Sequence, residues 1–302
     1  MKKFDFHVHF HNDITVEQMA YYFKDMCERK GYEGVGLMSI IHSEDDYPDC
    51  NEKALVLKEL LPNSIAFGAL FPDRDMVEQT KELLSKGFSG IKMLYGKPSE
   101  YMHFGFGYED KRFDEFFAYA EENHIPLLMH NNDPKLNWDI SKATPRAIEK
   151  GWVYDDKVPS QEWFFRALEK RLEDHKNLKV ALAHFGFYAD DIKRATRLME
   201  MCPNLYMDIT PAIEIYTQLS ERRDEAEEFF RKYYKRIFYG TDAESHLEGF
   251  AREYNDTKTE IITAFLEGKE PVEIKGRKIV PIKLEQYMLE DIYYNNCMEF
   301  IK

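Results

Sequence analysis

The chain alternates between two hydrophobic patterns. Short runs rich in β-branched and aromatic residues predict strands, and longer stretches with apolar residues three and four positions apart predict helices. The predicted strands are residues 4–10, 35–41, 64–71, 88–95, 125–131, 179–185, 205–210 and 236–241. The predicted helices between them are residues 15–31, a helix beginning at Pro48, and residues 75–86, 112–123, 160–175, 190–201 and 213–235. Eight strands that alternate with helices predict an α/β fold of the TIM-barrel, or (β/α)8, type.

An open, doubly wound sheet is the competing architecture. It is disfavoured because no GxGxxG or phosphate-binding loop follows any predicted strand. After the eighth strand, the pattern predicts a helix over residues 247–266, a hairpin over 272–282 that turns near Gly276, and a closing helix over 284–301. Since no linker or repeat interrupts the chain, we predict one domain over residues 1–302, with the hairpin as a small C-terminal decoration.

Composition and charge narrow the functional classes. The formal charge is −14, from 41 Lys and Arg against 55 Asp and Glu, and this charge opposes binding to a phosphate backbone. Apolar runs such as residues 125–129 are far too short to cross a bilayer. The four cysteines form no CxxC pair, and no apolar leader precedes the first strand, so we expect a cytoplasmic protein. These features favour a small-molecule substrate over nucleic acid or membrane, and they allow a homo-oligomer.

The first predicted strand carries two histidines. Its sequence is Asp5-Phe6-His7-Val8-His9-Phe10. Because side chains two positions apart in a strand point the same way, Asp5, His7 and His9 are predicted to share one face, and the apolar residues the other. Two imidazoles held side by side on a strand can bind one divalent metal ion. The alternative is a strand whose histidines simply face solvent.

Other strand ends carry further side chains that can bind metal. His130 lies at the end of the fifth strand, His184 near the end of the sixth, and Asp242 directly after the eighth. In a barrel these ends converge on one mouth, where the three side chains would meet His7 and His9. Taken singly, each has a simpler explanation, such as a packed histidine or an aspartate that caps the next helix. Taken together, imidazoles and a carboxylate suit Zn, with Mn or Fe as alternatives.

The same residues give the chain a resemblance to a known family. The motifs that carry it are His7-Val8-His9, Gly90-Ile91-Lys92, Met129-His130, Ala183-His184-Phe185-Gly186, Tyr239-Gly240-Thr241-Asp242 and the closing stretch Ile292-Tyr293-Tyr294-Asn295-Asn296. In order and spacing this set resembles the amidohydrolase superfamily over nearly the whole chain. It is most similar to the amidohydrolase-related (amidohydrolase 2) branch, which includes the aminocarboxymuconate-semialdehyde decarboxylase-like enzymes.

The resemblance implies a role for each of these side chains. His7, His9, His130 and Asp242 would hold one divalent metal ion, with a second metal less expected. His184 would be catalytic, as an acid–base group or as an electrophile that polarises the substrate, and Asp242 would also be catalytic. In other branches the sixth-strand histidine binds a second metal, and the eighth-strand aspartate is the general base.

Three residues are predicted to bind substrate: Lys92, Tyr95 and Arg146. Some superfamily branches have a carboxylated lysine at the position of Lys92, where it bridges two metals. The surrounding Gly-Ile-Lys-Met-Leu sequence is more similar to the one-metal relatives, in which a cation here could attract a substrate carboxylate. Tyr95 and Arg146 border or belong to long, aromatic-rich loops over residues 96–110 and 133–159, which are typical of lids and binding loops. The alternative is that the aromatics pack these loops onto the barrel.

Four more residues are assigned supporting positions. Three further histidines lie near predicted strand ends or loops: His11, His103 and His246. We expect them to contact residues of the site rather than the metal or the substrate. Asp5 lies deeper in the barrel than His7, so we predict that it supports the metal site structurally and does not bind the ion.

The leading functional interpretation is a metal-dependent hydrolase. It would cleave a C–N or C–O bond, in an amide, lactone or ester, of a small polar and carboxylate-bearing compound with a metal-activated water. A decarboxylase or other lyase would use the same residues. A metal-dependent phosphoesterase is a more distant alternative, suggested by Asp242 near His246, although the spacing is four residues rather than two. A non-catalytic protein is disfavoured because no expected ligand is missing.

Overall fold

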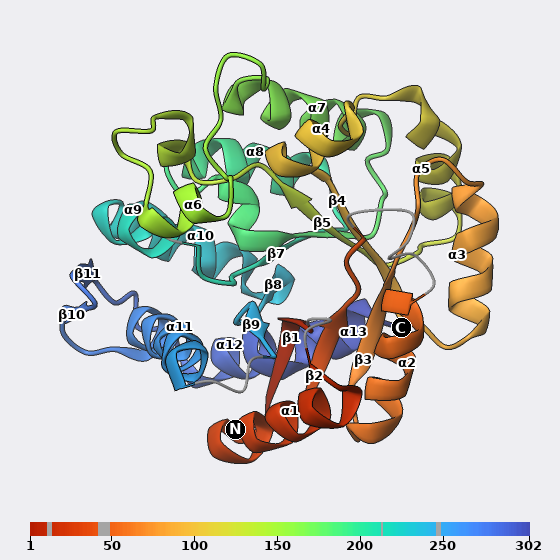
Figure 1. Ribbon diagram of the computed structural model, residues 1–302. Coiled ribbons are helices and arrows are strands. Elements are labelled where there is room, and N and C mark those ends of the chain that lie inside the picture. Colours follow the sequence, from red (N-terminus) through yellow and green to blue (C-terminus); the bar gives the residue numbers. More distant parts are fainter. Residues whose placement is uncertain (11–13, 42–48, 213, 246–248) are drawn as a thin grey trace.

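The central sheet contains nine parallel strands among the residues that the structure describes. The computed structural model describes residues 1–10, 14–41, 49–212, 214–245 and 249–302. The strands are β1 (Lys3–His9), β2 (Tyr32–Met38), β3 (Ile65–Ala69), β4 (Gly90–Gly96), β5 (Leu127–Asn131), β6 (Val180–Leu182), β7 (Leu205–Asp208), β8 (Ile237–Phe238) and β9 (Ala243–Glu244). Strands β1 to β8 pair in chain order, and β1 also pairs with β9 (Figure 1). The predicted TIM barrel is confirmed.

The barrel closes through the passage of chain that contains β8 and β9. The amide of Phe6 donates to the carbonyl oxygen of Tyr239 at 3.0 Å, and the amide of Asp242 donates to the carbonyl oxygen of His7 at 2.8 Å. β9 then pairs with the end of β1. The eighth strand is therefore split in two, because the left-handed backbone of Asp242, with φ of 56°, interrupts its extended conformation.

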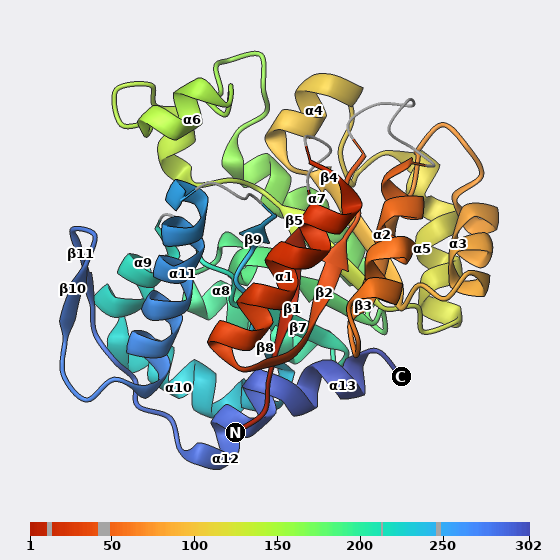
Figure 2. The ribbon, with the colours of Figure 1, turned by 60° about the horizontal axis from the view of Figure 1, so that its bottom comes forward.

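Helices surround the sheet and close its ends (Figures 1 and 2). The α-helices are α1 (Val16–Lys30), α2 (Asp49–Leu60), α3 (Met76–Ser85), α4 (Pro98–Phe104), α5 (Asp114–Glu122), α6 (Pro145–Glu149), α7 (Gln161–Asp174), α8 (Ile192–Met201), α9 (Ile215–Glu221), α10 (Arg223–Tyr233), α11 (Gly249–Glu267), α12 (Gln286–Glu290) and α13 (Asn296–Phe300). Short 3-10 helices cover Lys111–Phe113, Lys135–Trp138, Ala183–Phe187 and Tyr234–Arg236, and a π-helix covers Asp291–Asn295.

Several predicted segments differ from the structure, and two of them are instructive. The helix predicted over residues 213–235 is two helices, α9 and α10, because the backbone of Arg222 departs from helical geometry with ψ of 39°. The loop predicted over residues 96–110 contains α4, which has Pro98 in its first turn and ends at Gly105 with φ of 79°. The aromatic and glycine-rich composition of this segment concealed the helix. Pro48, the predicted start of the second helix, lies outside the described residues.

The two ends of the barrel are covered by different parts of the chain. Figure 2 shows α4 and α6, from the connections after β4 and β5, beyond the same end of the sheet. It shows α12 and α13 beyond the opposite end, near both termini. The predicted hairpin is present as β10 (Val272–Ile274) and β11 (Arg277–Ile279), which form a separate two-stranded sheet.

The lower interior of the barrel, which we call the aromatic base, is apolar. Its buried members are Phe4, Phe6, Met38, Ile65, Phe67, Leu128, Ala181, Ala183, Phe238, Cys297 and Phe300. The Phe6 ring lies 4.7 Å from the Phe238 ring and 6.0 Å from the Phe300 ring, measured between centroids. Phe300 comes from α13, so the final helix of the chain seals the base with an aromatic side chain.

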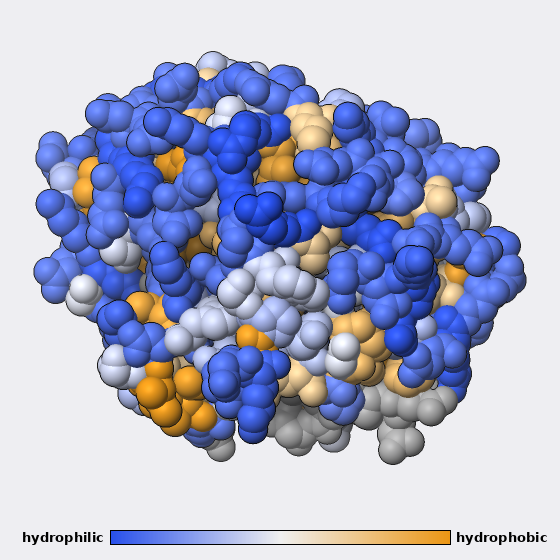
Figure 3. All heavy atoms as spheres, turned by 90° about the horizontal axis from the view of Figure 1, so that it is seen from above, coloured by the Kyte–Doolittle hydropathy of each residue, from blue (hydrophilic) through white to orange (hydrophobic). Residues whose placement is uncertain are grey.

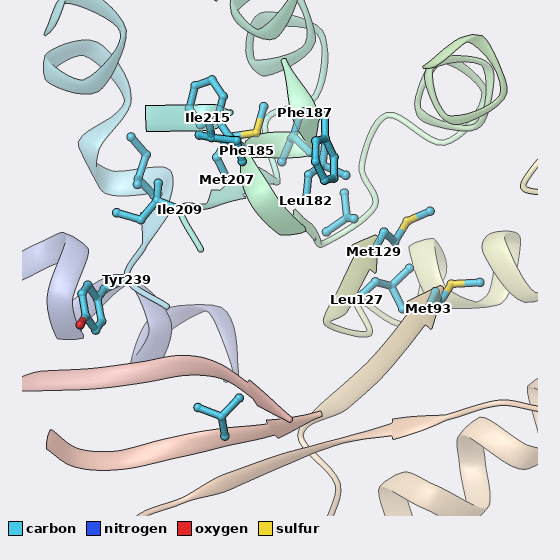
Figure 4. Packing of buried hydrophobic residues seen from close by; sticks show 14 of the residues in the cluster. Met93, Leu127, Met129, Leu182, Phe185, Phe187, Met207, Ile209, Ile215 and Tyr239 are labelled. Carbon is cyan, nitrogen blue, oxygen red and sulfur yellow. The ribbon is translucent and has the colours of Figure 1, made fainter. Parts of the chain in front are cut away.

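A larger apolar layer lies between the strands and the outer helices. Figure 4 shows part of it, in which Met93, Met129 and Leu182 point outward from their strands. The face of the molecule in Figure 3 is mainly hydrophilic, in keeping with charge that lies on a solvated surface. Within the described part of the chain, no helix combines the length and the apolar character that a bilayer span needs.

A bulge in β1 changes which residues face the barrel interior. Asp5 pairs with Val35, but Val8 pairs with Leu37, so β1 has one residue more than β2 in this interval. The close approach of the strands here requires Gly36, since a Cβ atom at that position would lie 2.0 Å from the carbonyl oxygen of Phe6.

The predicted face assignment of the first strand is therefore wrong in part. Phe6 and His7 are consecutive, yet Phe6 belongs to the aromatic base and His7 contacts side chains of the upper interior. Strict alternation would place them on opposite faces. The extra residue of the bulge breaks the alternation, so that both side chains point inward.

Candidate active site

Three side chains converge at the upper end of the barrel. The Nε2 atoms of His7 and His9 are 2.9 Å apart. The Oδ1 atom of Asp242 lies 3.2 Å from Nε2 of His9 and 3.7 Å from Nε2 of His7. One ligand atom of each residue lies within 4.8 Å of the other two. The histidines come from the end of β1 and the aspartate from the break between β8 and β9, two segments that the closing of the barrel joins.

A buried carboxylate orients the first of these ligands. Asp208, at the end of β7, lies with Oδ2 2.6 Å from Nδ1 of His7, and both side chains are fully buried. A carboxylate bound to one ring nitrogen leaves the other nitrogen available to a metal. Asp208 was not among the residues predicted from the sequence. Its signal was available, because it is an acidic residue inside an otherwise apolar predicted strand end.

The protonation states in this group suit a divalent cation. Burial lowers the pKa of His7 well below its ordinary value and also lowers the pKa of His9. Burial alone would raise the pKa of Asp242, but the ammonium of Lys258 and a hydrogen bond from His9 hold it well below its ordinary value. Two neutral imidazoles beside a carboxylate are a set of donors that Zn and similar ions bind. The residues therefore fit the predicted metal.

His130 lies outside this group of three. Its Nε2 atom is 2.8 Å from the carbonyl oxygen of Asn132 and 3.6 Å from the carboxylate of Asp133. Its ring centroid lies 5.0 Å from that of His184. His130 is thus close to the site but bonded to its own loop, and its role as a metal ligand stays a prediction.

His184 lies between His130 and His7. Its ring centroid is 5.7 Å from that of His7. Burial lowers the pKa of His184 to about 3, so its imidazole is neutral at physiological pH. Its Nδ1 atom lies 2.9 Å from the hydroxyl oxygen of Thr210. A neutral imidazole held by one nitrogen can receive a proton at the other.

Both predicted catalytic residues have left-handed backbones. The φ angle is 55° at His184 and 56° at Asp242, and after His184 it stays positive through Phe187. Left-handed geometry costs a non-glycine residue about 1–2 kcal/mol. Such conformations persist only when the surrounding structure enforces them, and they are concentrated at functional sites.

A cavity of about 460 Å³ opens beside these residues. Its lining includes His9, His130, His184 and Asp242, together with Arg146 from α6. Charged and aromatic side chains complete one side of it: Lys97, Glu100, Lys150, Trp152, Glu244, Tyr254 and Lys258. The structure therefore brings the predicted catalytic residues and one predicted substrate-binding residue to a single cavity.

Some of the charged residues that line the cavity are held by contacts with one another and with aromatic rings. The guanidinium of Arg146 lies 3.0 Å from the carboxylate of Glu244 and 5.0 Å from the ring of Tyr254. The ammonium of Lys97 lies 4.1 Å from the ring centroid of Trp152, within the range of a cation–π interaction. Lysine and arginine side chains thus reach the cavity from the loops after β4 and β5.

Tyr95 lies away from this cavity, and its role in substrate binding stays a prediction. Its hydroxyl donates to the carbonyl oxygen of Leu70 at 2.6 Å. Its ring packs against Phe104, Phe106 and Phe113. It is absent from the cavity lining. The alternative, that loop aromatics pack onto the barrel, describes this residue.

Lys92 does not line the cavity either. The residue is 2% exposed, and its ammonium lies 3.3 Å from Nε2 of His7. Burial lowers its pKa, while the carboxylates of Asp208 and Asp242 raise it. Lys92 is therefore placed against the ligand group rather than against the space for substrate.

Lys258, on α11, was also missed. Its ammonium donates to the carbonyl oxygen of Asp242 and lies 3.6 Å from the carboxylate of the same residue. It thus contacts both the backbone and the side chain of Asp242, and its positive charge stabilises the ionised carboxylate. Nothing in the sequence distinguishes this lysine from the others along the chain.

The residues assigned supporting positions have different outcomes. Asp5 accepts hydrogen bonds from the amide of Thr241 at 2.9 Å and from its hydroxyl at 2.5 Å, so it supports the segment that ends in Asp242. The His103 ring packs edge to face against Phe104, with ring centroids 4.6 Å apart, and does not line the cavity. His11 and His246 lie outside the described residues.

Comparison with known proteins identifies the family of the chain. The family described as Amidohydrolase (Amidohydro_2) matches residues 4–296, which is nearly the whole chain. The chain belongs to this amidohydrolase family, whose members are metal-dependent enzymes of the amidohydrolase superfamily. Among curated proteins, none matches the sequence.

Solved structures share the fold at low identity. A probable 2-pyrone-4,6-dicarboxylic acid hydrolase from Acinetobacter baumannii, with citric acid bound, is 11% identical, with a TM-score of 0.59 and coverage of 100% of this chain and 99% of that one. A 4-oxalomesaconate hydratase from Rhodopseudomonas palustris is 15% identical, with a TM-score of 0.59 and coverage of 99% and 95%. A dihydroxybenzoic acid decarboxylase from Polaromonas, with bound manganese and an inhibitor, is 11% identical, with a TM-score of 0.57 and coverage of 99% and 96%. At these identities the likeness shows the fold.

Proposed function

We propose that the chain is a hydrolase that uses one divalent metal ion to cleave a C–N or C–O bond of a small carboxylate-bearing compound. Zn is the expected metal, and Mn and Fe are the alternatives. The observation that supports this most directly is the convergence of His7, His9 and Asp242 at the edge of a cavity that His184 also lines. His130 is the fourth proposed ligand. When bound, such an ion polarises a carbonyl group and lowers the pKa of a water molecule to about 7.

The residues around the ion have separate tasks in this proposal. His184 is neutral and reaches the cavity, so it can accept a proton there and return it to the leaving group. The ammonium of Lys97 and the remaining guanidinium donors of Arg146 face the same cavity and can bind a substrate carboxylate. Lys92, beside His7, orders the ligand group instead of binding substrate.

Decarboxylation is a second candidate, and a specific observation favours it. A dihydroxybenzoic acid decarboxylase with this fold has manganese bound. The same ligands and the same carboxylate-binding side chains would serve a lyase. A phosphoesterase with two or three metals gains no support, since the described residues contain a single group of three close histidine, cysteine or acidic side chains.

Metal analysis and product analysis test the proposal together. Purified protein should contain Zn, Mn or Fe near one equivalent by inductively coupled plasma mass spectrometry. Metal-loaded protein should turn over members of a library of amides, lactones and carboxylic acids, with acid release as the sign of hydrolysis and carbon dioxide release as the sign of decarboxylation. Protein without stoichiometric metal, and with no activity after metal is added, would contradict both candidates.

The number of metals can be read from one variant. His184→Ala should keep its metal equivalent while it loses turnover, because His184 is not a ligand in the one-metal site. Loss of one equivalent out of two would indicate a binuclear site instead, with Lys92 as the candidate bridge.

A further inference from the structure

The segment at the end of β7 contacts both functional histidines at the same ring atom. Asp208 Oδ2 lies 2.6 Å from Nδ1 of His7, and Thr210 Oγ1 lies 2.9 Å from Nδ1 of His184. Asp208 and Thr210 are fully buried. They are also joined to each other, because the amide of Thr210 donates to Oδ1 of Asp208 at 2.6 Å. Two residues of one strand end thus connect the histidine of the ligand group with the histidine of the cavity.

Hydrogen-bond counting assigns the proton of His7. Burial raises the pKa of Asp208 to about 7, and above that pH its carboxylate is an acceptor only. A neutral His7 must then carry its proton on Nδ1 to bond with Asp208. The lone pair then lies on Nε2, which is the atom that faces His9 and Asp242.

The same counting assigns the proton of His184. Its Nδ1 atom lies 2.9 Å from the hydroxyl oxygen of Thr210 and 3.3 Å from the carbonyl oxygen of Thr210. The carbonyl can only accept, whereas the hydroxyl can donate or accept. A proton on Nδ1 satisfies both oxygens, while a bare Nδ1 would face the carbonyl lone pairs.

The hydroxyl of Thr210 has its own orientation in this arrangement. Its oxygen accepts from the backbone amide of His184 at 3.2 Å. Its hydrogen is then available to Asp208, and hydrogen bonds from the amide and hydroxyl of Thr210 oppose the effect of burial, which raises the pKa of Asp208. One carboxylate therefore receives, directly or through Thr210, the hydrogen bonds that both imidazoles donate.

We propose that Asp208 and Thr210 are positioning residues that fix His7 and His184 as the Nδ1–H tautomer, which directs the Nε2 lone pair of His7 to the metal group and makes the Nε2 of His184 a proton acceptor in the cavity. Only the catalytic use of the proton that His184 accepts rests on the proposed function. The tautomers themselves follow from the contacts and can be measured without a substrate.

The direct experiment is NMR of metal-free protein with ¹⁵N-labelled histidine. Long-range ¹H–¹⁵N spectra distinguish the two neutral tautomers, and His7→Gln and His184→Gln assign the signals. Both histidines should show the Nδ1–H pattern at a pH above the pKa of Asp208, which is about 7. A proton on Nε2 of His184 in the unmodified protein would overturn the proposal.

Variants of Thr210 test whether the hydroxyl is the cause. Thr210→Val keeps the shape and removes the hydroxyl, so the His184 signal should change toward a mixture of tautomers. Thr210→Ser should keep the original pattern. Thr80→Val is the matched control, since Thr80 is a buried threonine whose hydroxyl bonds to Met76 inside α3. Equal spectra for Thr210→Val and Thr210→Ser would contradict the role of the hydroxyl.

A substitution at Asp208 tests the His7 branch by metal affinity. Asp208→Asn can present an amide group to Nδ1 of His7 and transfer the proton to Nε2, which removes the ligand lone pair. The Kd for Zn, measured by competition with a chromophoric chelator, should rise about 10–100-fold. An unchanged Kd in folded protein would overturn this branch. Correct tautomers and Kd values in a protein with no hydrolytic activity would contradict the proposed function and leave this inference standing.

Discussion

The two halves of the barrel interior are opposites in chemistry. The aromatic base is filled by rings such as Phe6, Phe238 and Phe300, and its members are all apolar. The upper interior contains His7, Lys92, His184, Asp208 and Asp242 within a few ångströms of one another. Burial stabilises the first half through the hydrophobic effect. In the second half burial is costly, and only mutual hydrogen bonds and charges offset it.

This difference indicates that different residues provide the stability of the fold and the chemistry of the site. A side chain of the aromatic base has many neighbours and no chemistry, so its loss should weaken the fold and leave the site intact. A side chain of the upper interior takes part in the chemistry, so its loss should remove activity, and its cost in stability comes from polar partners left unpaired rather than from lost packing. Variants in the two halves test this separation, beginning with the largest effect.

The largest effect is expected at Asp242. Asp242→Ala should reduce turnover by about 10³-fold or more, because the ligand group loses its carboxylate. The protein should stay folded, since Asp242 is not part of the apolar core, but its melting temperature should fall because the buried ammonium of Lys258 loses its carboxylate partner. Asp242→Asn is the matched variant, because asparagine tolerates the left-handed backbone and removes only the charge. Retained activity in both variants would contradict the assigned role.

Loss of a ring from the aromatic base should produce the opposite result. Phe300→Ala should lower the free energy of unfolding by about 3–5 kcal/mol, because the Phe300 side chain is fully buried against Phe6, Tyr206 and Phe238. Denaturant titration measures this, with the exposed Tyr21→Ala as control. Metal affinity of the folded variant should match the parent protein, and a weakened affinity would show that the two halves are coupled.

Acid should destabilise the metal-free protein through its buried histidines. The folded pKa of His184 is about 3, below its ordinary value of 6.5, so only the unfolded chain binds a proton between these values. Stability from this group is complete above its ordinary pKa and falls as the pH is lowered. Between about pH 7.5 and pH 5.5 the loss should be about 1.4 kcal/mol for this one histidine.

The histidine contribution is isolated by a variant. His184→Asn should lose about 1.4 kcal/mol less than the parent protein over the same interval, as measured by denaturant titration. Burial also raises the pKa of Asp5, to about 7. That group acts with the opposite sign, since the folded protein then binds the extra proton, and it contributes equally to parent and variant. Equal pH dependence in the two proteins would refute a neutral His184.

The smallest effect on stability is expected at the cavity rim. Arg146→Met removes a partly exposed ion pair with Glu244, so the free energy of unfolding should change by less than about 1 kcal/mol. The KM for a carboxylate-bearing substrate should rise several-fold, with kcat nearly unchanged. Arg166→Met is the matched control, because it removes an exposed ion pair with Glu162 on α7. A fall in kcat alone would place Arg146 in the chemistry instead of in binding.

Much of the barrel could be predicted because its signals are local. Alternating strands and helices, the capping pair Thr15 and Gln18, and Gly31 at the end of α1 are all visible in the sequence and present in the structure. The split of the eighth strand could not be predicted, because it depends on the left-handed backbone of Asp242. The helix α4 was concealed because its composition is typical of a loop.

The sequence predicted which residues form the ligand group, but it did not predict the contacts that orient them. The strand-end rule brought His7, His9 and Asp242 together correctly, because barrel geometry makes those ends converge. The loop pattern that suggested Tyr95 does not show that its hydroxyl donates to the backbone carbonyl of Leu70, away from the cavity. The strand-end rule also missed Asp208. An acidic residue at the end of an apolar strand is visible in the sequence, but the sequence does not show that its carboxylate contacts His7.

Because of the bulge in β1, the number of residues in this part of the strand decides which way the histidines point. Between Asp5 and Val8 the strand carries one residue beyond what its neighbour requires. Removing Phe6 would leave the composition and the His-x-His motif recognisable. It would nevertheless rotate the following side chains by one register position, so that the histidines would point to the outer helices and apolar residues to the cavity. Active relatives should therefore lack deletions in this interval, even where they have substitutions.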